Sequence, residues 1–409
     1  PWCEIIRQWS TFHPEFAFLP RKFKIAVNGA EADRAAIGVH DIGLNVVRNE
    51  AGEIGFRVLV GGGLGRTPIV GSQICEFLPW QHLLTYLDAI LRVYNRYGRR
   101  DNKYKARIKI LVKALTPEVF AEKVAAEWAH TKDGPATLTQ QELDRVAGHF
   151  SAPAYEQFSG DDADYLAKRE AEKGFNNWAL RNVHAHKVPG YAAVTLSLKP
   201  TAVAPGDADD KQLDAIADLA DQFSFGELRV THQQNLVLAD VRQSDLYDLW
   251  QACRKHGFAT PNIGLLTDII CCPGGDFCAL ANAKSIPIAE AIQRTFDDLD
   301  YLHDIGDLDL NISGCMNACG HHHVGHIGVL GVDKKGQEFY QVSLGGNSGR
   351  DASIGQILGP SFSAEDMPSV MTKVIDVYIE NRTPEEQFLD TFKRIGMAPF
   401  KERVYAAAN

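Results

Sequence analysis

The sequence contains no apolar run of the roughly 18 to 20 residues that a membrane-spanning helix needs. Its first ten residues, PWCEIIRQWS, lack the basic start and the apolar core of a secretory signal, and they do not begin with Met. No low-complexity tract interrupts the 409 residues. These absences predict a soluble chain without a membrane partner. We also expect the sequence to be the C-terminal part of a longer polypeptide.

Acidic residues (52 Asp and Glu) outnumber basic residues (42 Lys and Arg). The formal net charge is −10, which disfavours binding to nucleic acid through neutralisation of its phosphates. A dinucleotide-binding fingerprint is absent, because the Gly-rich stretch VGGGLGRTP precedes no obvious helix and lacks the acidic residue expected roughly 20 positions later. One basic stretch, YGRRDNKYKARIKIL, could still bind a small anion.

The eight cysteines are too few for a chain of this length to be a disulfide scaffold. Five of them lie within residues 271–319. Without an export signal the thiols are expected to be reduced, which predicts a cytoplasmic protein. Clustered reduced cysteines favour metal ligands or catalytic groups over disulfides.

An internal repeat relates residues 25–66 to residues 310–350. The first copy reads VNGAEADRAAIGVHDIGLNVV and then FRVLVGGGLGR, and the second reads ISGCMNACGHHHVGHIGVLGV and then YQVSLGGNSGR. Two copies this far apart predict two related domains rather than a solenoid. Chance similarity of short Gly-rich strands is the alternative. The second copy has cysteines, Cys315 and Cys319, where the first has Ala30 and Arg34, so cluster chemistry would belong to one half only.

Between the copies the pattern predicts a small α/β unit. Strands are expected within residues 191–199, 227–231 and 235–241, and helices over residues 211–223 and 244–256. The first helix is expected to bury one face, formed by Leu213, Ile216, Leu219 and Phe223. The second is expected to begin at Ser244 as N-cap, to bury Leu246, Leu249, Trp250 and Cys253, and to end at Gly257. The order β-α-β-β-α predicts a ferredoxin-like sheet with helices on one face.

The predicted fold is therefore α+β and internally duplicated, with a ferredoxin-like half-domain and two related α/β domains. We place the first α/β domain at residues 1–150, a connector at 151–180 and the half-domain at 181–258. The second α/β domain, with the cluster cysteines, takes residues 259–409.

Two short Gly-rich segments carry the chemistry, CCPGGDFC at residues 271–278 and GCMNACG at residues 314–320. They contain a C-x5-C pair and a C-x3-C pair, whose four thiolates could close around a metal centre. The longer spacer is wide for structural zinc, whereas iron-sulfur clusters tolerate varied loops. Buried free cysteines remain the alternative. We interpret Cys271 as a neighbour of the ligands, although it could replace Cys272. Four nearby histidines, His321, His322, His323 and His326, could suggest a zinc or nickel site, which we do not favour.

These motifs resemble the signature of the siroheme- and 4Fe-4S-dependent sulfite/nitrite reductase family. The resemblance extends over nearly the whole chain, through PRKFKIAVNG, VLVGGGLGRTP, the basic stretch and ELRVTHQQNLVL. It implies four ligands to a 4Fe-4S cluster: Cys272, Cys278, Cys315 and Cys319. It further implies that Cys319 bridges the cluster and the siroheme iron.

Siroheme and the substrate are both anionic, so the family needs many cations around one cavity. The resemblance gives Arg107 and Lys109 this role at the substrate, with Arg107 replacing a Lys found in other members. Further contacts with siroheme are implied for Arg66, Arg100, His232, Gln233, Gln234 and Asn235. Two further substrate-site arginines and part of the siroheme cradle would come from a region upstream of Pro1.

The resemblance predicts an assimilatory sulfite reductase hemoprotein, which reduces sulfite to sulfide with six electrons. Nitrite reduction by the same family is the first alternative. A non-catalytic iron-sulfur electron-transfer protein and a structural zinc module are alternatives of other classes. Because the sequence has no dinucleotide fingerprint, a separate donor, a ferredoxin or an NADPH-dependent flavoprotein, is expected to supply electrons.

Overall fold

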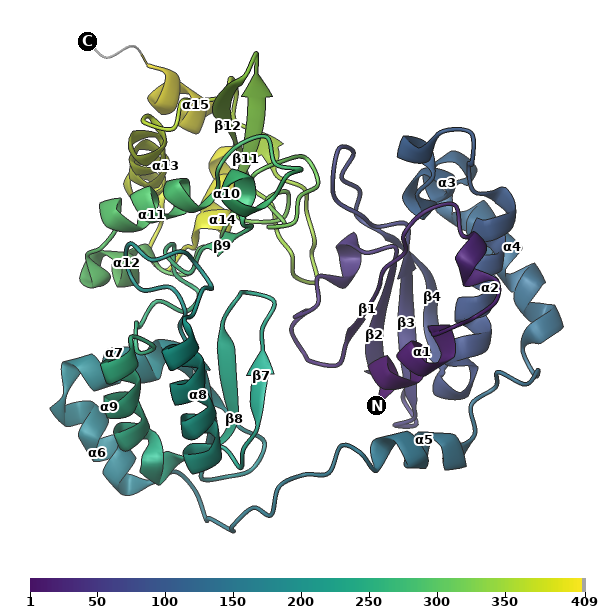
Figure 1. Ribbon diagram of the computed structural model, residues 1–409, viewed down its shortest axis with the longest axis horizontal. Helices are drawn as coiled ribbons and strands as arrows, with labels where there is room; N and C mark the ends of the chain where they lie inside the picture. The colour runs from purple at the N-terminus through teal and green to yellow at the C-terminus, as the bar shows by residue number, and fades with distance from the viewer. Residues whose placement is uncertain (407–409) are drawn as a thin grey trace. The chain divides into compact units, whose positions relative to one another are not determined.

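The computed structural model describes residues 1–406, which form two compact units (Figure 1). The first unit contains Pro1–Ala152 and Ser348–Ile354, and the second contains Pro153–Asn347 and the chain from Gly355 onward. Among the described residues, no helix has the length and apolarity needed to cross a membrane. The predicted domain boundaries at residues 150, 180 and 258 remain a prediction.

The first unit is built on a four-stranded sheet in the order β1-β2-β3-β4. Strand β1 is parallel to β2, and the other pairs are antiparallel. Phe56, Val58 and Val60 alternate along β3 and are fully buried, as expected for a strand with one face in the core. The strands are β1 (Ile25–Asn28), β2 (Ile42–Arg48), β3 (Ile54–Val60) and β4 (Ser72–Pro79). The helices are α1 (Trp2–Ser10), α2 (Leu83–Tyr97), α3 (Ile108–Leu115), α4 (Pro117–Thr131) and α5 (Gln140–Ala147), with 3-10 turns at Phe16–Phe18, Ile37–Val39, Trp80–His82 and Lys103–Lys105.

The second unit begins with the predicted small sheet, which is antiparallel in the order β5-β6-β8-β7. Its core lies between this sheet and the helices that Figure 1 shows on one face. Phe175 and Trp178 of α7 are fully buried in the same core. The strands are β5 (Val183–Ala185), β6 (Tyr191–Leu196), β7 (Leu228–Val230) and β8 (Leu236–Arg242), and the helices are α6 (Ala163–Ala171), α7 (Lys173–Asn182), α8 (Asp210–Phe223) and α9 (Leu246–His256).

Two details of this half-domain differ from the prediction. Leu213 is 53% exposed, because apolar spacing fixes a direction around the α8 axis but not how far the sheet extends beneath it. Ser244 is not the N-cap of α9, because a 3-10 turn at Gln243–Asp245 precedes the helix and the Ser244 hydroxyl donates to Asp245 instead. Gly257 does end the helix, with a φ of +82° that favours glycine.

The rest of the second unit is a five-stranded sheet in the order β13-β12-β11-β10-β9. Strands β9, β10 and β11 are parallel, and β12 and β13 are antiparallel to their neighbours. The strands are β9 (Ile270–Cys271), β10 (Leu310–Ser313), β11 (Ile327–Lys334), β12 (Gln337–Leu344) and β13 (Gln356–Ile357). The helices are α10 (Gly274–Phe277), α11 (Ile286–Thr295), α12 (Leu299–Ile305), α13 (Met367–Asn381), α14 (Phe388–Ile395) and α15 (Ala398–Tyr405).

Strand register confirms the internal repeat. Ile25 lies opposite Ile42 in the first unit, and Leu310 lies opposite Ile327 in the second, at the same separation along the chain. The helices that follow, α2 and α13, are both 15 residues long. A glycine also recurs where two backbones meet: a Cβ would lie 2.5 Å from a carbonyl oxygen at Gly62 and at Gly346 alike. The two copies therefore share one backbone frame.

Candidate functional site

The first cysteine loop leaves the end of β9. The Cys272 N–H donates to the Ile312 carbonyl at 3.1 Å, which extends the pairing of β9 with β10 by one residue. The Cys272 Sγ in turn accepts a hydrogen bond from the Gly314 N–H at 3.1 Å. Helix α10 is a single turn that closes with the Cys278 N–H donating to Gly274 at 2.9 Å. The loop therefore directs one thiol at a backbone donor of the second loop.

The second cysteine loop leaves the parallel neighbour β10, so both loops emerge from the same edge of the sheet. A Cβ on Gly314 would lie 2.6 Å from the Ala283 carbonyl oxygen and 2.9 Å from Gly274 Cα. The two loops are therefore in backbone contact, and only glycine allows the approach. Cys315 is buried in this loop, whereas Cys319 is exposed.

The residues present fit a sulfur-ligated cluster. Backbone N–H groups near cluster sulfurs are one means by which a protein adjusts a reduction potential, and the Gly314 N–H already meets one predicted ligand. None of the eight cysteines, all of which lie in the described residues, forms a disulfide. In residues 1–406, no group of three or more His, Cys, Asp or Glu side chains gathers as the ligand set of a single ion. The ligands of a 4Fe-4S cluster, by contrast, bind separate iron atoms around a cube.

Cys271 differs from Cys272 in its surroundings. Burial, followed by the neighbouring Cys272, raises the pKa of the Cys271 thiol, and its S–H is directed at the Cys272 carbonyl at 3.3 Å. A thiol that resists ionisation is a poor metal ligand. These surroundings agree with the interpretation of Cys271 as a neighbour of the ligands.

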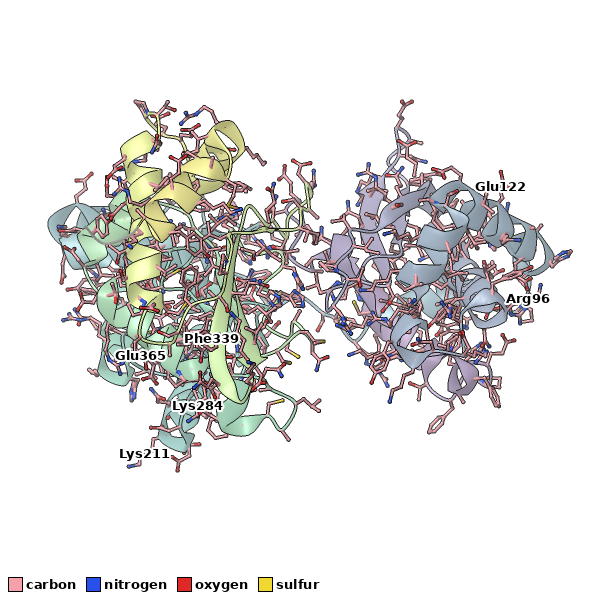
Figure 2. All side chains as sticks on the ribbon, turned by 90° about the horizontal axis from the view of Figure 1, so that it is seen from above. Arg96, Glu122, Lys211, Lys284, Phe339 and Glu365 are labelled. Atoms are coloured by element: carbon pink, nitrogen blue, oxygen red, sulfur yellow. The ribbon has the colours of Figure 1, made fainter. Side chains whose placement is uncertain are left out.

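The first cysteine loop also carries an ion pair at its surface. Lys284, labelled in Figure 2, follows the loop in the chain and lies 3.0 Å from Asp276 (Nζ to Oδ1). Hydrogen bonding to Asp276 and its charge raise the pKa of Lys284. Both side chains keep access to solvent, so the pair adds little stability.

The histidines beyond Cys319 have different environments. His322 is 2% exposed, and neither of its ring nitrogens has a hydrogen-bond partner among the described residues. The centroid of its ring lies 4.0 Å from that of His323, and the two rings are tilted by 41°. Burial and the neighbouring histidines lower the pKa of His322 to about 3, so the ring is neutral. His326 Nδ1 accepts from the Asp309 N–H at 3.2 Å. His322 and His326 thus occupy separate environments.

The turn between β7 and β8 contains four predicted cofactor contacts. His232 and Gln233 are exposed. The Gln234 amide bonds both backbone groups of Cys271, donating to its carbonyl at 2.8 Å and accepting from its N–H at 2.7 Å. Asn235 is buried, donates to Asp268 at 2.9 Å and accepts from the Leu198 N–H at 3.1 Å. Two of the four side chains therefore already bond protein groups.

The sequence analysis missed the buried ion pair beneath this turn. Lys199 Nζ lies 2.6 Å from Asp268 Oδ1 and also donates to the Gln233 carbonyl, although Lys199 is only 1% exposed. Asp268 further accepts from the Gly264 N–H at 3.0 Å. A lysine at the end of a predicted strand gives no sign of burial, so only the fold reveals this pair.

The two predicted substrate-site cations lie in the first unit. Arg107 makes a bidentate ion pair with the fully buried Asp41, with its Nη2 2.7 Å from each carboxylate oxygen. Lys109 is 6% exposed and donates to the carbonyls of Leu64 at 2.8 Å and Thr67 at 2.6 Å. Burial, followed by the charge of Arg107, lowers the pKa of Lys109 to about 8. Lys109 thus holds the Gly-rich loop and can release a proton near neutral pH.

Two other predicted cofactor contacts in this unit, Arg66 and Arg100, differ in their hydrogen bonding to the protein. Arg66 is exposed in the Gly-rich loop. Arg100 donates to the carbonyls of Phe18 at 2.9 Å and Asn95 at 2.8 Å, so its guanidinium ties the basic stretch to the unit.

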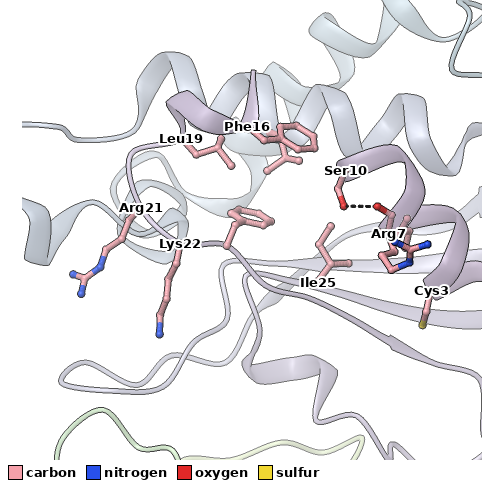
Figure 3. Close-up of a pocket in the computed structure, with 11 residues that line it drawn as sticks. Cys3, Arg7, Ser10, Phe16, Leu19, Arg21, Lys22 and Ile25 are labelled. Atoms are coloured by element: carbon pink, nitrogen blue, oxygen red, sulfur yellow. Dashed lines mark hydrogen bonds between the residues drawn. The ribbon is translucent and has the colours of Figure 1, made fainter. Parts of the chain in front are cut away.

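A cavity in the first unit adds cations that the sequence analysis did not single out. It has a volume of about 660 Å³ and an apolar floor that includes Phe16 and Ile25, and Arg7, Arg21 and Lys22 line it as well (Figure 3). Arg7 already pairs with Glu4, and Arg21 donates to the Lys103 carbonyl at 2.6 Å. The segment PRKFK was a usable signal, because it places two adjacent cations before strand β1.

Comparison with known proteins assigns the class. The family described as "Nitrite and sulphite reductase 4Fe-4S domain" matches residues 1–132 and 265–409, and the "Nitrite/Sulfite reductase ferredoxin-like half domain" matches residues 177–256. The chain belongs to this family of sulfite and nitrite reductases. The match to both halves and to the half-domain confirms the predicted fold class. The predicted cofactors, a 4Fe-4S cluster and siroheme, are those of the family.

Individual relatives carry both substrate names. A sulfite reductase (ferredoxin) 1 of Mycolicibacterium paratuberculosis is 26% identical over 94% of this chain. An assimilatory ferredoxin-dependent nitrite reductase of Haloferax mediterranei is 27% identical over 90% of this chain. The chain spans 64% and 60% of the length of these two relatives. The solved structure of the Mycobacterium tuberculosis NirA protein shares the fold, with a TM-score of 0.72 and 24% identity over 97% of this chain and 67% of that one.

Proposed function

We propose that this chain is the part of an assimilatory sulfite reductase hemoprotein that holds a 4Fe-4S cluster coupled to siroheme. The observation that carries the proposal is the contact between the two cysteine loops, with the Gly314 N–H directed at Cys272 Sγ at 3.1 Å. In this proposal Cys272, Cys278, Cys315 and Cys319 would hold the cluster, and Cys319 would also hold siroheme. When bound, the coupled cofactors supply the one-electron steps that together reduce sulfite to sulfide.

In this proposal, cationic side chains of this chain bind the sulfite anion. Arg107 and Lys109 attract and orient sulfite, and Asp41 fixes the guanidinium of Arg107 from behind. Lys109 has a pKa of about 8, so it is largely protonated at neutral pH and can donate a proton to a departing oxygen. The exposed side chains of Arg66, His232 and Gln233 can turn toward siroheme carboxylates. The Arg100 guanidinium and the Gln234 and Asn235 amides already bond protein groups, so they would have to share these bonds with siroheme.

Nitrite is the alternative substrate, because it is also an anion that takes six electrons and would use the same cations. Relatives named as ferredoxin-dependent enzymes favour a ferredoxin as the electron donor. An NADPH-dependent flavoprotein is the alternative donor. Clustered cysteines without disulfides favour a reducing compartment, so we propose the cytoplasm. A non-catalytic electron carrier remains the alternative of another class.

The test is the visible absorption spectrum, with iron and acid-labile sulfide analysis, of chain produced in cells that make siroheme. We expect siroheme bands, and iron and sulfide in the proportions of one 4Fe-4S cluster and one siroheme. Cys272→Ser and Cys319→Ser should lose these signals, whereas Cys3→Ser, which changes an exposed cysteine outside both loops, should keep them.

Turnover then separates the functions. Reduced ferredoxin with sulfite or with nitrite decides the substrate, and a coloured chain without siroheme supports the electron carrier instead. A colourless or zinc-bearing chain would overturn the proposal.

A further inference from the structure

Strand β9 is the edge of its sheet and contains only two residues. One side of it pairs with β10, where Cys271 lies opposite Ile312. A short edge strand leaves backbone N–H and C=O groups on its other side, and these require partners when they are buried. Cys271 is 3% exposed, so its outward groups cannot rely on water.

The side chain of Gln234 supplies both partners. Its Nε2 donates to the Cys271 carbonyl at 2.8 Å, and its Oε1 accepts from the Cys271 N–H at 2.7 Å. One amide thus gives Cys271 the donor and acceptor that a neighbouring strand would give. Cys272 follows in the chain, and its Sγ meets the Gly314 N–H. The position of the Cys271 backbone therefore determines the position of Cys272, the first predicted cluster ligand.

The turn that presents Gln234 is itself held firmly. The φ of Gln234 is +59°, a conformation that non-glycine residues rarely adopt and that surrounding contacts must stabilise. Gly206 permits it, because a Cβ there would lie 2.7 Å from the Gln234 Cβ. Asn235 and Lys199 both bond Asp268, which lies two residues before the start of β9. The half-domain turn and the start of the cluster loop are thus joined by one buried polar network.

We propose that Gln234 is a positioning residue for the iron-sulfur site, which clamps Cys271 through its backbone and so sets the place of Cys272. This inference rests on the proposed function for its cofactor, but the clamp itself belongs to the protein without cofactor. It gives Gln234 a role different from direct contact with siroheme. A contact residue would leave the Cys271 backbone unaffected when it is replaced in the apo chain.

The first experiment is amide hydrogen exchange of the apo chain, read at single residues by mass spectrometry. Gln234→Leu removes both bonds, and the Cys271 N–H should exchange about tenfold faster. Amides of the half-domain strand β8 should be unchanged. Gln222→Leu is the matched control, because Gln222 is an exposed glutamine of α8 in the same half-domain. Exchange of Cys271 at the wild-type rate in Gln234→Leu would refute the clamp.

The second experiment loads each variant anaerobically with ferrous iron and sulfide. Gln234→Leu should retain less cluster through gel filtration and show a shifted reduction potential, with Gln222→Leu matching wild type. Gln234→Glu keeps the acceptor for the Cys271 N–H and loses the donor, so it should fall between them, and it serves if Gln234→Leu does not fold. Wild-type retention and potential in both Gln234 variants would refute the role in the site. If wild type takes up no cluster while the exchange result holds, the proposed function fails and the clamp stands.

Discussion

The ion pair between Asp41 and Arg107 gives a sharp test of how the first unit holds its predicted substrate-site cation. Asp41 is fully buried and accepts from the Lys24 N–H at 3.0 Å, from Arg107 Nε at 3.0 Å and from Arg107 Nη2 at 2.7 Å to each oxygen. Asp41→Asn removes the charge and turns an acceptor into a donor that faces donors. Breaking a buried pair from one side costs about 3 to 5 kcal/mol. Because the Arg107 side chain keeps 15% exposure, we expect the lower end, about 3 kcal/mol.

The assay is hydrogen exchange of the slowest amides of β2 and β3, which reports the free energy of unfolding of the first unit alone. The internal repeat supplies the control. His326 occupies the position of Asp41 in the second copy, and its Nδ1 accepts one bond, from the Asp309 N–H at 3.2 Å. His326→Asn should cost about 1 kcal/mol in the second unit. Asp41→Asn with Arg107→Met should cost less than the sum of the single changes, with a coupling of about 2 kcal/mol.

A loss below about 1 kcal/mol for Asp41→Asn, or single changes that simply add, would refute this reasoning. Arg107 would then be held by contacts other than its pair with Asp41. Its orientation toward an anion could not be attributed to the buried carboxylate.

Two further predictions concern the Gly-rich loop and the cysteine loops. Burial lowers the folded-state pKa of Lys109 from 10.5 to about 8, so the unfolded chain binds more protons between these values. The free energy of unfolding of wild type should therefore rise with pH relative to Lys109→Met, by about 3 kcal/mol across that range; a difference independent of pH contradicts this. Gly314→Ala places a Cβ 2.6 Å from the Ala283 carbonyl oxygen and should lose bound iron after reconstitution, unlike Gly160→Ala, where nothing lies within 4 Å. Equal iron retention in the two variants contradicts the close packing of the loops.

Much of the fold could be predicted from spacing alone. The repeat was found from residues such as Gly62 and Gly346, because close backbone approaches that only glycine allows leave a mark in the sequence. The end of α9 at Gly257 was predictable for the same reason. The start of α9 was not, because a serine of N-cap type gives no sign that a 3-10 turn will take its place.

In the two cysteine loops residue type and spacing carry the predicted chemistry, and the structure brings these loops into backbone contact. The site was not predictable where long polar side chains form hydrogen bonds or ion pairs with residues far away in the sequence. Gln234 reads as a cofactor contact in the sequence, yet its amide bonds the Cys271 backbone 37 positions away. Lys199 and Asp268 form a buried ion pair. It exists only because the fold brings the chain after β6 next to the chain before β9. Such pairings depend on tertiary geometry, and a single sequence does not encode them in any local pattern.

The duplicated frame also separates what the fold needs from what the chemistry needs. The second copy places Cys315 and Cys319 where the first has Ala30 and Arg34. In both copies the parallel strand pair that precedes this loop has the same register. The frame therefore forms without the thiols, so packing alone does not account for Cys315 and Cys319 in the second copy.

The same comparison applies to the cations of the first copy. Residues 98–107 connect α2 to α3, whereas the shorter segment of residues 382–387 connects α13 to α14, so the basic stretch is an addition to the shared frame. Lys109 is the second residue of α3, and Leu389 is the second residue of α14. The shared fold thus accepts an apolar side chain at this helix position. The first copy instead buries the Lys109 ammonium, and its lowered pKa means that this charge destabilises the fold at neutral pH. The second copy has no charge at this position. A function best explains why the first copy keeps a charge that destabilises it, and this supports the proposed role of Lys109 at the anion.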